Sequence, residues 1–308
     1  MDETGHECPY EEADIWEALP KLVGHEKGRA YFELSNAAYS RGNFARSLTL
    51  AESARDLFLE MENEEEGLAH SYASVAYSLN SLKKLPDAIE QMRKSIEVFE
   101  SIGLKDEWTM RRNLANWMQT AKRFEDSGVL FIKCAERELF EGCEVQAALD
   151  FFGYAQALCE LDKDEDAIKQ FRLGRDYFKK HKEVFRVAEA DFFIGRCLNH
   201  LEDGFEAEVY LRKALITFEL GEYVGRQSQA LSQLGRALTF QQRYEEALEE
   251  LNKAHLMIRH NGCVNFNWLF IVQKNMIRAL KGLGRDKEVL ELQRKNDVLD
   301  ETLELEYK

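Results

Sequence analysis

Asparagine, glutamine, arginine and tyrosine residues recur in this chain at helical spacing, and their side chains suit the binding of an extended peptide. A carboxamide offers a donor and an acceptor, so it can bond to the N–H and C=O groups of a peptide backbone. Arginine adds a fork for a carboxylate, and an aromatic ring can anchor an apolar side chain. The candidate binding residues are Asn36, Tyr39, Tyr77, Asn80, Arg112, Asn113, Asn116, Gln156, Arg196, Asn199, Arg236, Lys274, Asn275 and Arg278, with Phe152, Phe192 and Phe193 as further aromatic anchors.

Patterns that would indicate catalysis or a cofactor are missing from the sequence. It contains no H-E-x-x-H, Walker-type loop or G-x-S-x-G, and Gly282-x-Gly284 lacks the third glycine of a dinucleotide loop. His255, His260 and Cys263 lie close together but match no zinc spacing. We therefore expect no enzymatic activity, no cofactor and no metal. The six cysteines form no C-x-x-C pair, so we expect free thiols that pack as small hydrophobic residues.

A repeat of about 40 residues positions the candidate binding residues. Small or short side chains recur at Ser47, Ala88, Ser127, Ala167, Ala207, Ala247 and Val289, at intervals of 39 to 42 residues. A second column, eleven residues later, is mostly aromatic, with members Phe58, Phe99, Phe178, Phe218 and Ile258. A third column, thirteen residues before the small one, is apolar and contains Leu34, Val75, Leu114, Tyr154, Ile194, Leu234 and Met276.

Each repeat contains two runs of apolar residues at helical spacing with a short break between them. In the sixth repeat the runs are 229–240 and 245–259. Two antiparallel helices approach closely where one presents a small residue, and a single hairpin cannot bury its apolar face. Stacked hairpins bury a continuous core. We predict an all-α solenoid of about seven helix-turn-helix units in a single domain, residues 29–300, with an acidic leader and capping helix in residues 1–28 and a polar tail in residues 301–308.

The segment 231–258 resembles a tetratricopeptide repeat. Leu234, Gly235, Leu238, Tyr244, Ala247 and Ala254 stand at the signature places of that family. The period of 40 is longer than usual and resembles that of Rap-like regulators, kinesin light chains, Pins-type adaptors and MalT-like activators. The resemblance implies a right-handed superhelix whose first helices line a concave groove. It also implies a function as a peptide-binding scaffold or, alternatively, as a Rap-like signalling or transcription regulator whose superhelical pitch changes when a peptide binds.

The acidic net charge of the chain is not shared by the positions assigned to the inner helix faces. The chain carries 41 Lys and Arg against 56 Asp and Glu, a net charge of −15, which argues against nucleic acid as a direct partner. Among the 42 positions assigned to the inner helix faces, seven residues are basic and three are acidic. The basic inner face therefore favours an acidic segment or a free C-terminus of a protein or short peptide.

The location and assembly of the chain are less constrained by its sequence. No apolar run reaches the roughly 20 residues of a membrane span, and the N-terminal residues are acidic where a secretory signal would be basic. We therefore expect a cytoplasmic protein without a membrane partner. Self-association through the end repeats or the second helices is possible, although no pattern specifies it.

Overall fold

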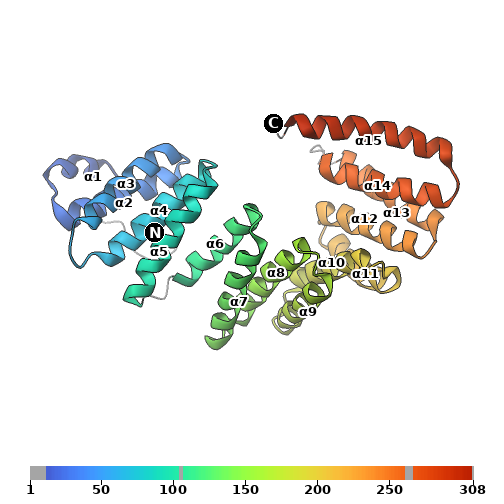
Figure 1. The fold of residues 1–308 in the computed structure, drawn as a ribbon, viewed down its shortest axis with the longest axis horizontal. Helices are drawn as coiled ribbons and strands as arrows, with labels where there is room; N and C mark the ends of the chain where they lie inside the picture. The colour runs from blue at the N-terminus through green and yellow to red at the C-terminus, as the bar shows by residue number, and fades with distance from the viewer. Residues whose placement is uncertain (1–11, 104–106, 261–265, 307–308) are drawn as a thin grey trace. The chain divides into compact units, whose positions relative to one another are not determined.

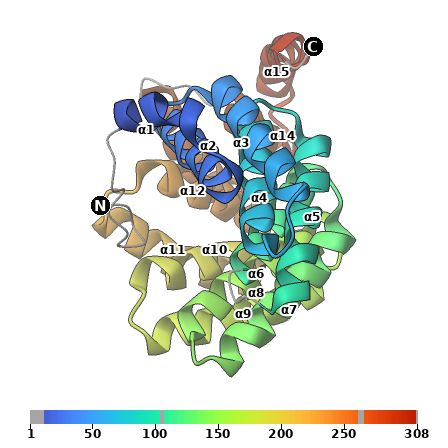
Figure 2. The same ribbon diagram turned by 90° about the vertical axis from the view of Figure 1, so that its left-hand side faces the viewer.

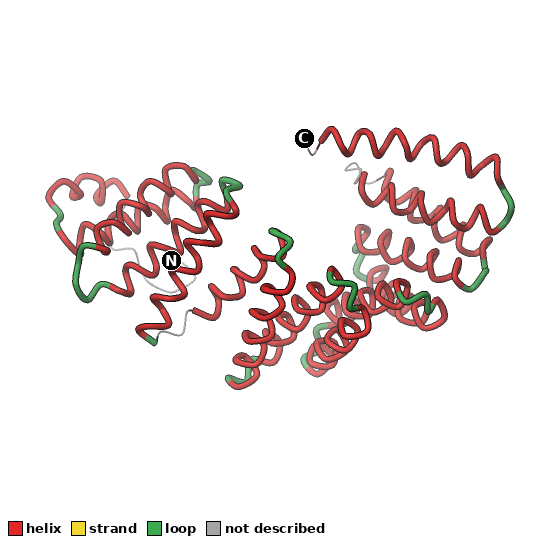
Figure 3. The backbone as a smooth tube through the Cα atoms, viewed as in Figure 1, coloured by secondary structure: helices red, strands yellow, loops and turns green. Residues whose placement is uncertain are grey.

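The structure is a computed structural model that describes residues 12–103, 107–260 and 266–306. These residues form fifteen α-helices and one short 3₁₀ helix, with no strand among them (Figures 1 and 3). The predicted all-α repeat architecture is confirmed. The helices belong to two compact units, residues 1–134 and 135–308, which are described separately below.

The first unit holds α1 to α6 and most of α7. Their bounds are α1 Glu12–Ala18, α2 Gly24–Ser40, α3 Phe44–Leu59, α4 Glu65–Ser81, α5 Leu85–Ile102, α6 Glu107–Thr120 and α7 Phe124–Phe140. Helix α1 ends at Ala18, because Pro20 lies at the start of a 3₁₀ turn, Leu19–Lys21, where its missing N–H cannot extend α1. Helices α2, α3 and α4 pack side by side (Figure 2).

The second unit begins within α7 and continues through α15. Its other helices are α8 Glu144–Glu160, α9 Asp164–Lys180, α10 Val184–His200, α11 Gly204–Leu220, α12 Val224–Phe240, α13 Tyr244–His260, α14 Phe266–Gly282 and α15 Asp286–Glu306. From α8 to α13 every helix has 17 residues and every turn has three, so each hairpin takes 40 residues. The observed helix and turn lengths therefore account for the period of the sequence.

The short turns depend on a left-handed residue at the end of each helix. Glycine takes this conformation at Gly42, Gly142 and Gly284, but eight turns use a residue with a Cβ atom. These eight are Asn63, Lys83, Lys122, Asp162, Lys182, Glu202, Glu222 and Gln242, with φ between 55° and 63°. The left-handed residue lets a following backbone N–H bond back to the last helical carbonyls, as Asp203 N does to Leu198 O at 2.9 Å.

The columns found in the sequence form the core. All seven members of the small column are at most 5% exposed, and all five members of the aromatic column are at most 7% exposed. In the first unit the hydroxyls of Ser35, Ser47 and Ser78 form a buried chain across α2, α3 and α4, with Oγ–Oγ distances of 3.1 and 2.9 Å. The buried columns leave the opposite faces of the first helices available for binding.

Candidate functional site

Seven of the predicted binding residues occupy one position of the repeat, two residues after the buried Leu34 column. They are Asn36, Tyr77, Asn116, Gln156, Arg196, Arg236 and Arg278. All seven are at least partly exposed, and each lies on the first helix of its hairpin. We call these helices (α2, α4, α6, α8, α10, α12 and α14) the A helices, and the second helices of the hairpins the B helices. The column changes from amide and phenol groups in the first four hairpins to arginines in the last three.

In the first unit the predicted residues connect neighbouring A helices. The Tyr39 hydroxyl lies 3.0 Å from Ser81 Oγ, and Ser74 Oγ donates to Asn36 Oδ1 at 3.5 Å. Asn113 Nδ2 donates to the Tyr77 hydroxyl at 2.8 Å. Burial raises the pKa of Tyr77, against the effect of the Asn113 hydrogen bond. The structure thus links Tyr77 and Asn113 through their polar groups.

Other predicted residues of the first unit lie on the same helices with varied exposure. Asn80 and Arg112 are half-buried on α4 and α6, and Asn116 is exposed on α6. Gln156 is also half-buried, on α8 of the second unit. These side chains remain candidates for contact with a ligand.

In the second unit two of the predicted binding residues are asparagines that connect adjacent helices. Asn199 is fully buried, and its Nδ2 donates to Gln233 O at 2.8 Å on the next A helix. Asn275 is 3% exposed, with its Nδ2 3.3 Å from Ser232 Oγ. The amides of Asn199 and Asn275 therefore hold adjacent A helices together and do not face a ligand.

The expected aromatic anchors of the second unit are also core residues. Phe192 and Phe193 are 1% and 7% exposed, and Phe152 packs against Phe193 with ring centres 5.1 Å apart. They were assigned to the inner face because they follow its helical spacing, but the aromatic cluster between α8, α9 and α10 takes them into the interior. Phe193 still contributes to the surface, because it supports a cation.

Four cations of the A helices lie on aromatic rings or amides. Arg196 lies over Phe193 with its guanidinium carbon 4.7 Å from the ring centre, Arg236 lies 5.5 Å from Phe240, and the Lys274 ammonium lies 4.2 Å from Phe270. Arg278 Nη1 donates to Asn275 Oδ1 at 3.1 Å. Within the part of the chain that the structure describes, none of the four forms an ion pair with a carboxylate.

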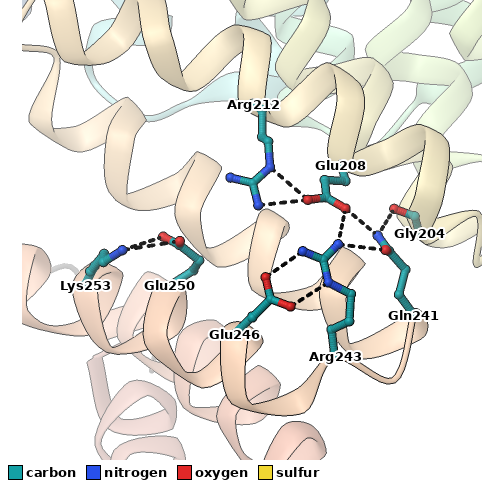
Figure 4. A network of polar contacts seen from close by, with 8 residues as sticks. All are labelled: Gly204, Glu208, Arg212, Gln241, Arg243, Glu246, Glu250 and Lys253. Atoms are coloured by element: carbon teal, nitrogen blue, oxygen red, sulfur yellow. Dashed lines mark hydrogen bonds and ion pairs between the residues drawn. The ribbon is translucent and has the colours of Figure 1, made fainter.

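Several arginines of the B helices and their turns are paired with acids. Figure 4 shows Arg212 and Arg243 converging on Glu208, with N–O distances of 2.8 and 2.7 Å. Arg243 also donates to Glu246 at 2.8 and 2.6 Å, and Gln241 donates to Glu208 at 2.8 Å (Figure 4). On the A helices, Arg29, Arg186 and Arg226 are paired with acids in the same way, so the four unpaired cations are a subset of the A-helix cations.

Two of the unpaired cations affect one another. Burial, followed by the positive charge of Arg278, lowers the pKa of Arg236. Arg278, Lys274 and Lys281 also line a pocket of about 400 Å³ between α14 and α15. Converging positive charge of this kind favours an anion.

Of the three neighbouring residues His255, His260 and Cys263, the structure describes the side chain of the first. His260 and Cys263 lie outside the residues whose side chains the structure describes, and His255 is half-buried with a pKa lowered by burial. Within the described helices none is both long and apolar enough to cross a membrane.

Comparison with known proteins rests on structure. No protein-family model matches the chain, and no curated protein sequence does. Many solved structures resemble it, among them the following three. The apo form of RapI has a TM-score of 0.59, 14% identity, and coverage of 85% of this chain and 99% of that one. A signal-transduction ATPase with a tetratricopeptide-repeat sensor from Pyrococcus horikoshii has a TM-score of 0.69 and 16% identity, over 93% of this chain and 45% of that one.

The third structure is YrrB, which is described as a TPR protein with an unusual peptide-binding site. It has a TM-score of 0.51 and 14% identity, over 67% of this chain and 93% of that one. The chain has the tetratricopeptide-repeat fold. Within this fold, the A helices carry the residues that the sequence predicts for binding.

Proposed function

We propose that this TPR protein is a scaffold that binds an extended segment of a partner protein or a short peptide, and that it recognises a carboxylate on that segment. The observation that carries the proposal is the set of unpaired cations Arg196, Arg236, Lys274 and Arg278 on the A helices. An acidic side chain or a free C-terminus of a ligand would supply the ion-pair partner that these four cations lack among the described residues.

The setting of these cations strengthens the effect of a ligand carboxylate. Arg196 and Arg236 are half-buried, so their charges are screened less by solvent than those of fully exposed residues. The rings of Phe193 and Phe240 limit the orientations of the two guanidinium groups, which reduces the entropy lost when a carboxylate binds. A charge-assisted hydrogen bond in such a place contributes about 1.5–3 kcal/mol.

The exposed amides and phenols of the remaining A helices would hold the backbone of the ligand. The proposed contacts are Asn36, Tyr39, Tyr77, Asn80, Arg112, Asn113, Asn116, Gln156, Arg196, Arg236, Lys274 and Arg278. Asn199 and Asn275 are left out because they bridge helices. The peptide-binding site named for YrrB, a protein of the same fold, supports a peptide as the class of ligand.

Selection from random twelve-residue peptides displayed on phage, with free C-termini, tests this proposal. We expect the wild-type chain to enrich peptides with acidic residues or a required terminal carboxylate. Arg236→Glu combined with Arg278→Glu should lose these peptides. The control combines Arg212→Glu with Arg285→Glu, which changes the net charge equally on B helices and their turns, and it should retain them. Equal recovery by the two double variants contradicts the proposal.

A second candidate is a regulator that responds to a bound peptide, as in the Rap-like alternative. It is favoured by the resemblance to RapI and to a protein whose repeats are described as a sensor. Repeat arrays couple mainly through neighbouring repeats, so a ligand that spans several repeats can alter the helical pitch. Solution scattering of the whole chain with and without a selected peptide tests this candidate, and superimposable curves argue against it.

A further inference from the structure

Three metal-ligand side chains meet where the fourth and fifth hairpins adjoin, and a histidine lies beside one of them. Cys159 is on the last turn of α8, Asp164 is the first residue of α9, and Cys197 is on the last turn of α10. The two sulfur atoms lie 3.2 Å apart, and both sulfurs and an Asp164 oxygen lie within 4.8 Å of one another. His200, the last residue of α10, places Nδ1 3.3 Å from both Asp164 oxygens.

We propose that Cys159, Cys197, Asp164 and His200 form a binding site for Zn²⁺ that joins these two hairpins. Two thiolates, a carboxylate and an imidazole are donors that zinc accepts in a tetrahedral arrangement. Cys159, Cys197 and Asp164 are at most 6% exposed, while the His200 side chain is 37% exposed. The site is therefore enclosed on the thiolate side and open on the imidazole side.

The distances suit a zinc ion after a small adjustment. Zn–S bonds of about 2.3 Å in a tetrahedral site place two sulfurs roughly 3.8 Å apart, and Zn–O bonds of about 2.0–2.2 Å place the carboxylate oxygen slightly closer to them. The observed sulfur separation of 3.2 Å is shorter than this, while the outer limit of 4.8 Å is longer. Shifts of an ångström or less in the two sulfurs and the Asp164 oxygen therefore give a shell of three donors, and rotation of the exposed His200 side chain would supply the fourth.

The fold assembles the site from two local pairs. Cys159 and Asp164 flank the three-residue turn between α8 and α9, whose left-handed residue is Asp162. Cys197 and His200 are three residues apart on α10, so they share one helix face. Packing of α8, α9 and α10 then brings the two pairs together across 38 residues of sequence.

The thiols are already unequal in their proton affinity. The hydrogen bond with Cys197 lowers the pKa of Cys159, and the positive charge of Arg196 acts in the same direction. The same hydrogen bond, together with burial, raises the pKa of Cys197. Binding of Zn²⁺ would displace the protons of both thiols, so that two thiolates and one carboxylate face the ion. The charge of Arg196 beside the cluster weakens cation binding, and we therefore expect a site weaker than one made of four thiolates.

Titration of the reduced, chelator-treated full chain with Co²⁺ tests the site. We expect one equivalent to produce a thiolate-to-cobalt charge-transfer band with tetrahedral d–d bands, and Zn²⁺ to abolish both by displacement. Cys159→Ser combined with Cys197→Ser should remove the charge-transfer band, whereas Cys143→Ser, at an exposed cysteine, should leave it unchanged. His200→Ala should keep the band but weaken binding at least tenfold.

Folding of the variants is checked separately. Circular dichroism should show the same helicity for the double serine variant, and Asp164→Asn offers a near-isosteric ligand change with both cysteines retained. Zn²⁺ should raise the thermal midpoint of the wild type but not that of the double serine variant. The proposal is overturned if the reduced wild type gives no thiolate band, if the band persists without the two cysteines, or if the pair forms a disulfide in air but takes up no metal when reduced.

Discussion

The guanidinium carbon of Arg196 lies 4.7 Å from the centre of the Phe193 ring, one turn earlier on α10. Phe193 is 7% exposed and packed against Phe152 and Phe171, so the ring is a fixed support. The ring holds the guanidinium group at the half-buried surface of α10, where its Nε is buried without a hydrogen-bond partner. This arrangement presents an oriented cation without using a carboxylate of the chain.

Replacement of Arg196 by lysine tests the value of this orientation. Lysine keeps the charge but loses the planar stack and the two-pronged hydrogen bond. We expect Arg196→Lys to weaken binding of a selected acidic peptide about 3- to 10-fold, measured by fluorescence anisotropy. In the Arg196→Gln variant, which loses the charge, the affinity should depend less steeply on salt concentration. Arg212→Lys on a B helix is the matched control and should bind as the wild type does. Equal loss in both variants would mean that the stack on Phe193 has no special role.

A close contact between hairpins predicts opposite effects at two glycines. A Cβ atom added to Gly204 would lie 2.4 Å from the carbonyl oxygen of Ala237, whereas one added to Gly225 would meet nothing within 4 Å. Gly204→Ala should therefore lower the free energy of unfolding by about 1–3 kcal/mol. Gly225→Ala should raise it by up to about 1 kcal/mol, because alanine is the better helix former. Urea unfolding followed by circular dichroism measures both changes. If Gly204→Ala left the free energy of unfolding unchanged, α11 and α12 would separate easily at this contact.

The left-handed turn residues predict a stabilising substitution. Glu222 has φ of 55°, which costs a residue with a Cβ atom about 1 kcal/mol relative to glycine. Glycine at this position would remove that cost, but part of the gain is offset by the greater freedom of glycine in the unfolded chain. We expect Glu222→Gly to raise the free energy of unfolding by about 0.5 kcal/mol. Glu219→Gly, at a helical position three residues earlier, should lower it by a similar amount, and a decrease in both variants would contradict the turn assignment.

The acid network of Figure 4 predicts a pH-dependent contribution to stability. Partial burial alone would raise the pKa of Glu208, but hydrogen bonds from Gln241 and Arg212 and the charges of Arg212 and Arg243 lower it overall. A carboxyl whose pKa is lowered in the folded state stabilises the protein above its ordinary pKa near 4.5, and this contribution is lost as the pH falls through the lowered value. Glu208→Gln should therefore cost about 1–2 kcal/mol at pH 7 and much less at pH 3.

Denaturant unfolding at both pH values measures the difference for Glu208→Gln. The control is Glu219→Gln on the same helix, since Glu219 is exposed and has no ion pair among the residues described. A cost for Glu208→Gln that is the same at both pH values would show that packing of the side chain, and not its charge, explains the effect.

The repeat was predictable because it depends on side-chain size at fixed intervals. The small column at Ala88 and Ala207 and the aromatic column at Phe99 and Phe218 are fully buried, as their spacing indicated. The inner face was predictable only in part. Helical spacing places Asn199 and Phe192 on that face. It does not reveal that the next A helix covers Asn199, or that an aromatic cluster encloses Phe192.

The sequence by itself determined the helical hairpins and their 40-residue period, and it predicts a basic character for the inner helix faces. These properties follow from local spacing and composition, which need no knowledge of neighbouring hairpins. Only the tertiary structure decided which cations lack a carboxylate and which asparagines bridge helices. It also decided that Cys159 and Cys197, 38 residues apart, touch. These relationships arise where one hairpin stacks on the next. Distances across that contact depend on how the helices pack, and the spacing of residues within one helix does not encode this packing.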